Sequence, residues 1–175
     1  EVEVDGRTRA TVGDDVQLLA GHDVSVTADL DHGVDVDAFA ESVALGGASV
    51  VTGTIDDEST SWAQVGDRAI VSAGETVTIE ALDTRNLDVN VLGVSAGIAS
   101  AGAAEAYVTV SGEIGLPTAW VSLGSAQEIT APEIVIRAEA DIFALADTDI
   151  DSLALGFGVI KANSEVTVDS MVKVS

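Results

Sequence analysis

The chain of 175 residues carries 30 acidic and 7 basic side chains, which gives a net charge of −23 at neutral pH. Nucleic-acid binders gain affinity by neutralising phosphates with Lys and Arg, so this charge excludes nucleic acid, and also an anionic membrane surface, as a partner. The apolar content of 47% is too high for a disordered acidic tail, and 26 Val and 26 Ala predict a core of β-branched and small side chains. The sequence has no cysteine and no apolar run near the roughly 20 residues that span a bilayer.

Alternation of apolar and polar residues predicts an all-β fold. In chain order, the clearest runs are 23–28, 34–37, 87–91, 107–110 and 165–169. This period of two places apolar side chains on one face, as in a half-buried strand. The Ala-rich stretch 96–106 contains Gly97 and Gly102 between β-rich flanks, which disfavours a helix. The chain opens and closes within strand-like patterns, at 1–4 and 171–174, so we expect it to be a piece of a longer polypeptide.

An internal repeat organises these runs. The element Thr-Val-Gly-Asp at 11–14 recurs as Gln-Val-Gly-Asp at 64–67, which is 53 residues later, and more loosely as Ser-Leu-Gly-Ser at 122–125, a further 58 residues on. The longer spacing indicates an insertion of about five residues around Gly115-Leu116-Pro117. We therefore expect one β-solenoid segment over 1–175, with repeats at about 8–60, 61–117 and 118–175.

A solenoid of this kind needs corners and an inward face. A coil of roughly 25 residues predicts two turns in each repeat, with Gly, Asp and Asn at the corners. The expected corners are 13–15, 21–23, 31–33, 66–67 and 74–75, and the residues assigned inside are Val24, Val26, Val77, Ile79, Ile134 and Ile136. Tandem β-sandwiches are the alternative, but they need bulkier cores and no strict repeat.

The repeated pattern resembles that of giant secreted bacterial adhesins. The residues that carry the resemblance are Ala-Thr-Val-Gly-Asp at 10–14 with Ala-Gly-His-Asp-Val-Ser-Val-Thr-Ala at 20–28, and their counterparts at 63–67 and 73–81. The pattern looks like the filamentous-haemagglutinin-like and leukotoxin-like families. That resemblance implies a secreted, rod-like β-solenoid on the bacterial cell surface, which serves in adhesion or filament formation and has no active site. The charge of −23 departs from these families and suggests a saline or cation-rich habitat.

The acidic residues are the most abundant polar functional groups. If successive coils stack in register, their carboxylates form outward columns, which repel one another unless Ca²⁺ or Na⁺ is bound. The candidate calcium ligands are Asp35, Asp37, Asp147, Asp149 and Asp151. No segment matches a known calcium loop, so diffuse counter-ion binding stays open as the alternative, and no other cofactor is expected.

No catalytic pattern stands out, and we predict that the chain is not an enzyme. His22 and His32 lie in Asp/Gly-rich segments and are interpreted as exposed corner residues. Trp62 and Trp120 flank the repeated Gly element, one residue apart in register, and are interpreted as packing over a coil edge. A carbohydrate-binding or polysaccharide-cleaving β-helix is the alternative, which would need these aromatic rings as open platforms beside paired carboxylates.

Stretches of small residues follow each repeated element, at 43–50, 96–103 and 153–160. Two interpretations remain open: a narrow side of the solenoid whose two walls approach closely, or a flat outer face that packs against a neighbouring molecule. We expect the chain to be a structural segment of an extracellular fibre or stalk. It would associate with itself end to end or side by side.

Overall fold

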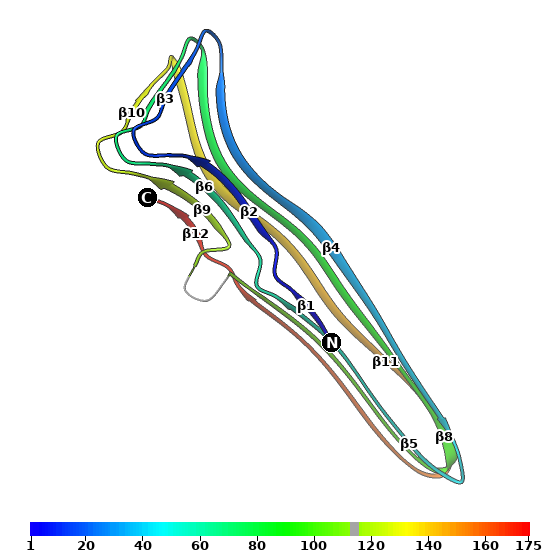
Figure 1. Cartoon of the computed structure of the whole chain (residues 1–175). Helices are drawn as coiled ribbons and strands as arrows, with labels where there is room; N and C mark the ends of the chain where they lie inside the picture. The colour runs from blue at the N-terminus through cyan, green and yellow to red at the C-terminus, as the bar shows by residue number, and fades with distance from the viewer. Residues whose placement is uncertain (113–115) are drawn as a thin grey trace.

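The computed structural model describes residues 1–112 and 116–175, and this part of the chain is all-β, with no helix (Figure 1). In chain order the strands are β1 (Val2–Val4), β2 (Arg7–Val12), β3 (Gln17–Ala20), β4 (Val24–Val43), β5 (Gly46–Asp57), β6 (Thr60–Val65), β7 (Ile70–Ala73), β8 (Thr76–Ser111), β9 (Ala119–Leu123), β10 (Glu128–Thr130), β11 (Glu133–Asp169) and β12 (Val172–Val174). The all-β prediction is confirmed.

The chain follows nearly the same path three times, and each circuit is called a pass. The first pass comprises β2 to β5, the second β6 to β8 and the third β9 to β11. Strands of successive passes pair in parallel, in the sheets β2-β6-β9-β12, β3-β7-β10 and β1-β5-β8-β11, while β4 pairs with the first half of β8. A sandwich is built from antiparallel sheets, so the parallel pairing of the described strands excludes tandem sandwiches.

The pairing register follows the spacing of the repeat. Val24 pairs with Val77 and Ala10 with Ala63, both 53 residues apart. The prediction of two turns per repeat is wrong, because coils of about 25 residues would pair residues at that shorter spacing. The reason is the length of β4. At about 3.3 Å per residue its 20 residues extend for roughly 66 Å before the chain turns back along β5.

Each pass therefore has two parts, which Figure 1 shows clearly. The head is the three-sided end formed by β2, β3 and the beginning of β4 with the strands paired to them. The arm is the long, narrow part in which β4 runs out and β5 returns. In the second pass both limbs of the arm belong to β8, which pairs with β4 through residues 77–96 and with β5 through residues 99–110.

The core consists of ladders of like side chains from successive passes. Val26, Ile79 and Ile136 share one ladder of the head, and Val34, Leu87 and Ala144 share one of the arm. The second pass lies between the other two, so Ile79 and Leu87 are fully buried, whereas Val34 and Ala144 are half-buried. All six residues assigned inside face inward in this alternation, although Ile134 on the outermost pass remains 44% exposed. Full burial of one such side chain contributes about 1.5–3 kcal/mol.

Small residues allow the two walls of the arm to approach. A Cβ on Gly53 would lie 2.7 Å from Val89 Cγ1 and 2.8 Å from Val91 Cγ2, on the opposite wall. Gly102 lies in a similar position against Ile150, where a Cβ would be 3.2 Å from the nearest side-chain atom. Gly102 belongs to the stretch 96–103, so the interpretation as a narrow side with close walls is confirmed at this inward position, and Gly53 extends the same arrangement beyond the stretch 43–50.

The corners agree with the sequence in four of the five predicted places. Residues 13–15, 21–23, 66–67 and 74–75 connect the short strands of the head, whereas 31–33 continue β4 without a turn. The offset between passes rises from 53 at Ser61 and Thr8 to 58 at Ser61 and Ala119. The five additional residues thus lie between the end of β8 and β9. Gly115 of the predicted insertion is outside the described residues.

Candidate functional site

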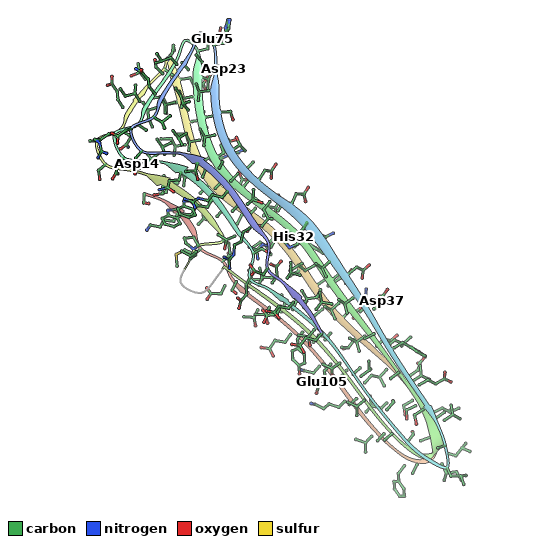
Figure 2. The ribbon with its side chains drawn as sticks, viewed as in Figure 1. Asp14, Asp23, His32, Asp37, Glu75 and Glu105 are labelled. Carbon is green, nitrogen blue, oxygen red and sulfur yellow. The ribbon has the colours of Figure 1, made fainter. Side chains whose placement is uncertain are left out.

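The predicted calcium ligands lie on the outer face of the arm. Asp35 and Asp37 point outward from β4, and Asp147, Asp149 and Asp151 point outward from β11 (Figure 2 labels Asp37). Asp37 and Asp147 both align with Asn90 of the second pass, so one row across the arm reads Asp-Asn-Asp. Asp149 instead aligns with Leu92 and Phe39, and Asp35 aligns with Asp88. The candidates are therefore spread along the face rather than converging.

A shallow hollow of about 360 Å³ covers part of this face, lined by Asp37, Asn90, Asp147 and Asp149 together with apolar residues. In the described part of the chain, no three His, Asp or Glu side chains are placed to hold one metal ion. Specific calcium binding at these residues stays a prediction.

The two histidines occupy different environments. His22 lies exposed at a corner of the head, and its Nδ1 is 2.9 Å from Glu75 Oε1 (Figure 2 labels Glu75). His32 was expected at an exposed corner as well, and this prediction is wrong. It faces inward from β4, its side chain is 19% exposed, and its Nε2 is 2.7 Å from Asp57 Oδ2. The residues flanking His32 are typical of a turn, which led to the wrong prediction. Its partner Asp57 is far along the chain, at the end of β5, the strand that returns beside β4.

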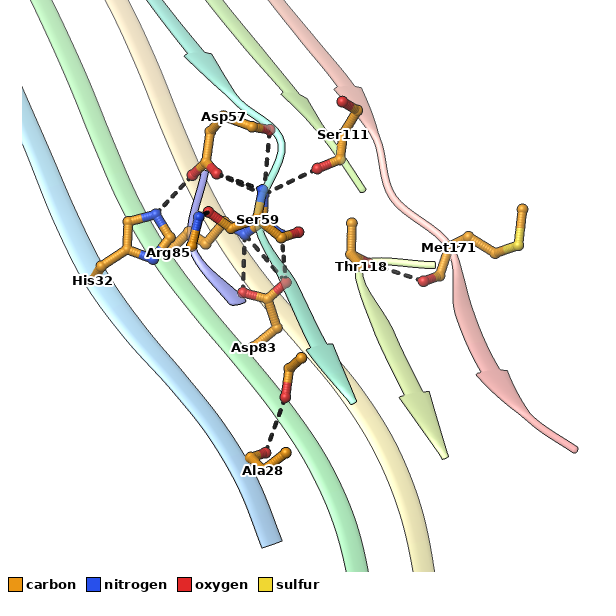
Figure 3. Close-up of polar contacts among 11 residues, drawn as sticks. Ala28, His32, Asp57, Ser59, Asp83, Arg85, Ser111, Thr118 and Met171 are labelled. Carbon is orange, nitrogen blue, oxygen red and sulfur yellow. Dashed lines mark hydrogen bonds and ion pairs between the residues drawn. The ribbon is translucent and has the colours of Figure 1, made fainter. Parts of the chain in front are cut away.

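His32 belongs to a buried polar cluster where the head meets the arm (Figure 3). The centre of the cluster is Arg85, whose side chain is fully buried between the two limbs. Its guanidinium donates to both carboxylate oxygens of Asp83, at 2.7–3.1 Å, and lies 3.1 Å from Asp57 Oδ1. It also donates to the backbone carbonyl oxygens of Ser59 and Ser111. These bonds satisfy the Arg85 donors, as burial of a guanidinium requires.

The single positive charge of Arg85 does not neutralise both carboxylates of this cluster. Two buried carboxylates, Asp57 and Asp83, share one guanidinium. Burial raises the pKa of Asp83 above its ordinary value, and the negative charge of Asp57 adds to the rise, while the hydrogen bonds from Arg85 act in the opposite direction. The cluster belongs to the first two passes only, because Ala140 and Ile142 of the third pass align with Asp83 and Arg85.

The two tryptophans form a column on the head sheet. Trp62 and Trp120 pair directly, so the expected offset of one residue is wrong, and their rings stack 4.9 Å apart with an angle of 3°. Arg9 lies over the other face of Trp62 at 4.1 Å, and Lys173 over the other face of Trp120 at 5.4 Å. Each indole thus has both faces covered, which supports a packing role and leaves no open stacking platform for a sugar ring.

Aspartates at the corners connect one pass to the next. Asp14 Oδ1 accepts a hydrogen bond from the backbone N–H of Asp67 at 2.8 Å, and Asp67 Oδ1 accepts one from Ser125 at 2.6 Å (Figure 2 labels Asp14). Asp23 accepts from Thr76 in the same way, at 3.0 Å. Asp15, Arg68 and Ala126 follow at the same corner with φ of 56–57°. The aspartate of the Val-Gly-Asp element therefore connects each pass to the following one through a hydrogen bond to its backbone.

The outermost strands present long open edges. β11 pairs with β8 along one edge, and β4 pairs with β8 along one edge; among the described residues no strand pairs with the other edge of either. β1 pairs with residues 55–57 of β5, so the rest of that edge of β5 has no partner strand among the described residues. β12 pairs with residues 119–121 of β9, and Met171 and Ser175 extend its hydrogen bonds to Thr118 and Leu123. Unpaired N–H and C=O groups along such edges are templates for the addition of a further parallel strand.

Neither the family models, nor the curated proteins, nor the solved structures provide a match to this chain. No helix long and apolar enough to cross a bilayer occurs in residues 1–112 or 116–175.

Proposed function

We propose that this chain is a segment of a β-solenoid rod whose role is structural, as part of a fibre or stalk outside a bacterial cell. In this proposal each pass is one repeat of the solenoid, and further passes add to the open edges of the first and third passes. The cell-surface location rests on the resemblance of the Val-Gly-Asp and Ala-Gly elements to those of secreted adhesins.

One observation carries the proposal: residues 53 apart in the first two passes, and 57–58 apart in the second and third, pair in parallel along nearly the whole pass. Within residues 1–112 and 116–175, β4 and β11 each keep one edge without a partner strand. Stacked passes contact their neighbours in the same way at every level, so the arrangement has no inherent end. The corner aspartates give the stack a direction, because each accepts from the following pass.

The charge is compatible with this role. Polar and acidic residues such as Asp35 and Asp37 occupy the outward positions of the arm, while Val and Ala occupy the inward ones. An acidic exterior keeps separate rods apart and in solution, while the association along the axis uses backbone hydrogen bonds. The carbohydrate alternative depended on the tryptophans as platforms, and the covered faces of Trp62 and Trp120 give it no support.

The proposal is tested by placing a charge where only stacking would bury it. Ala144 faces inward on the third pass and is half-buried, whereas Leu87, which occupies the same place in the second pass, is fully buried. In Ala144→Lys the ammonium reaches solvent over the open edge of a single chain, but a fourth pass would bury it. Leu145→Lys is the matched control, because Leu145 faces outward and its counterpart in the stacked second pass, Asp88, remains partly exposed.

Negative-stain microscopy and light scattering at high protein concentration compare the three proteins. We expect rods for the wild type and for Leu145→Lys and no rods for Ala144→Lys. No rods for any of the three, or rods for all three, would contradict association through the edge of β11.

A further inference from the structure

The end of the arm carries an apolar surface that the stacking of passes does not use. The arm tip is defined as residues 42–51, 94–104 and 152–160, where the three passes turn back. These segments contain no charged residue, in a chain with a net charge of −23. Large side chains point outward from them: Leu155 is 86% exposed and Phe157 88%, and Val43, Leu45 and Leu153 are each exposed by about two thirds or more.

The arm tip is large enough to be an interaction surface. Eight large apolar side chains within it point outward and are more than half exposed, and at on the order of 100 Å² each they present several hundred Å². Soluble monomers rarely expose more than a few hundred Å² of contiguous apolar surface without using it to bind. Five of them line one shallow hollow: Val43, Leu45, Ile98, Leu153 and Leu155.

We propose that the arm tip binds the arm tip of a second copy of this chain, so that two rods pair tip to tip. The first reason is charge. Two molecules of −23 repel each other across their acidic faces, and contact through the uncharged tips keeps these faces furthest apart.

The second reason is spacing. Strands of neighbouring passes lie about 4.8 Å apart, so the outward side chains of each tip form rows at that interval. A second tip has rows at the same interval, and the two sets can interdigitate along their whole length. The tip also contains Gly46, where an added Cβ would meet nothing within 4 Å, so this position leaves room beside the larger side chains. A self-complementary patch of this kind favours a twofold pair.

The third reason favours a second copy of the chain over a lipid surface as the partner of the arm tip. Segments that sit at a lipid interface are typically anchored by Trp, Tyr, Lys or Arg, and the arm tip contains none of these residues. The expected area for one pair is near the lower limit of stable interfaces, about 1,000 Å² in total. Pairing of single chains is therefore weak, and it strengthens with the number of stacked passes.

The inference does not rest on the proposed function, since each single chain carries the whole arm tip. Sedimentation equilibrium in 0.5 M NaCl uses the Ala144→Lys background, in which stacking through β11 is blocked, and compares this parent with the same protein carrying Leu155→Ser/Phe157→Ser or Phe143→Ser. Phe143 is 59% exposed on the outer face of the arm, outside the tip, and serves as the matched control. We expect dimers for the parent and the control, and at least tenfold weaker association for the protein with both tip substitutions. Equal association of all three proteins, or a monomeric parent at the highest concentration, would overturn the proposal.

Spin labels distinguish tip pairing from stacking, and the absence of native cysteine makes labelling specific. Ala99→Cys places a label at the tip and Leu19→Cys one on the head, both at exposed positions. Tip pairing brings the tip labels close and leaves the head labels roughly 130 Å apart, twice the length of the arm. With both labels in the Ala144→Lys background, close approach at both positions would indicate stacking instead of tip pairing and would overturn the proposal. Binding of the monomer to phosphatidylcholine vesicles through the tip, without dimers, would overturn it as well.

Discussion

Gly74 lies directly against the backbone carbonyl of Gly21: a Cβ added to Gly74 would be 2.1 Å from that oxygen. The two glycines occupy the same corner in successive passes, yet a Cβ on Gly21 would meet nothing within 4 Å. The steric requirement for glycine at this corner therefore comes from the preceding pass. In the described structure only Gly74 of this pair faces that constraint.

This relationship predicts opposite results for two chemically identical changes. Gly74→Ala should lower the free energy of unfolding by about 3 kcal/mol, the upper end of the usual cost of overpacking, because the clash is with backbone. Gly21→Ala should leave the stability of the single chain unchanged. Urea denaturation of the two variants measures both. A Gly21→Ala variant as unstable as Gly74→Ala would contradict the assigned stacking at this corner.

The ladders of the second pass should dominate stability. Ile79 is fully buried between Val26 and Ile136, so Ile79→Asp would bury an unpaired charge at a cost of several kcal/mol. Thr78→Asp is the control, because Thr78 lies on the opposite face of β8 and is only half-buried. We expect a change within about 0.5 kcal/mol for this control. Comparable damage from both changes, measured by thermal unfolding, would show that the register is shifted by one residue.

The buried polar cluster predicts a specific dependence on pH. Because the pKa of Asp83 is raised in the folded state, the folded chain retains this proton at pH values where the unfolded chain has lost it. The contribution of Asp83 to stability is therefore greatest at low pH. It falls as pH rises from the ordinary value of 3.8 through the folded pKa.

Asp83→Asn removes this titration and leaves Arg85 with Asp57 as its carboxylate partner. We expect the stability of Asp83→Asn relative to the wild type to increase with pH over the same window. Denaturant unfolding of both proteins at several pH values measures the difference. A difference that is constant with pH, or that changes in favour of the wild type, would contradict the raised pKa.

The acidic face of the arm predicts a dependence on salt. Outward carboxylates such as Asp37 and Asp147 flank Asn90 across adjacent passes, and their repulsion is screened over about 10 Å at 0.1 M salt. The thermal midpoint should rise with NaCl, and it should rise further with millimolar Ca²⁺ if these residues bind calcium specifically. A midpoint that is indifferent to both would argue against repulsion between the carboxylate rows.

The sequence predicts the pairing better than the path of the chain. The spacing of Gly13 and Gly66 gives the register directly, because stacked passes repeat their corner residues. The alternation along β4 does not reveal how far a strand runs before the chain turns. The predicted number of two turns per repeat is wrong for this reason. Asp31 and Gly33 are typical of turns, yet their strand continues because β8 pairs alongside them.

The buried cluster could not be predicted from the sequence for a related reason. His32 and Asp57 are 25 residues apart, and they meet only because β5 returns beside β4. Arg85 stands where the first pass has His32, so the repeat does not conserve the residue type at this position. The four charged or titratable side chains of the cluster meet because the chain turns back at the end of the arm. The small residues around that turn are compatible with several turn positions, so the sequence does not predict which residues of the two limbs lie opposite each other.

The most direct test of stacking through open edges is fibre diffraction or cryo-electron microscopy of the protein concentrated in 0.5 M NaCl. The proposed rod predicts particles many passes long, with strands perpendicular to the long axis and a repeat of about 4.8 Å along it. Discrete particles that contain three passes, at every concentration and salt, would contradict the claim that further passes add to the edges of β4 and β11.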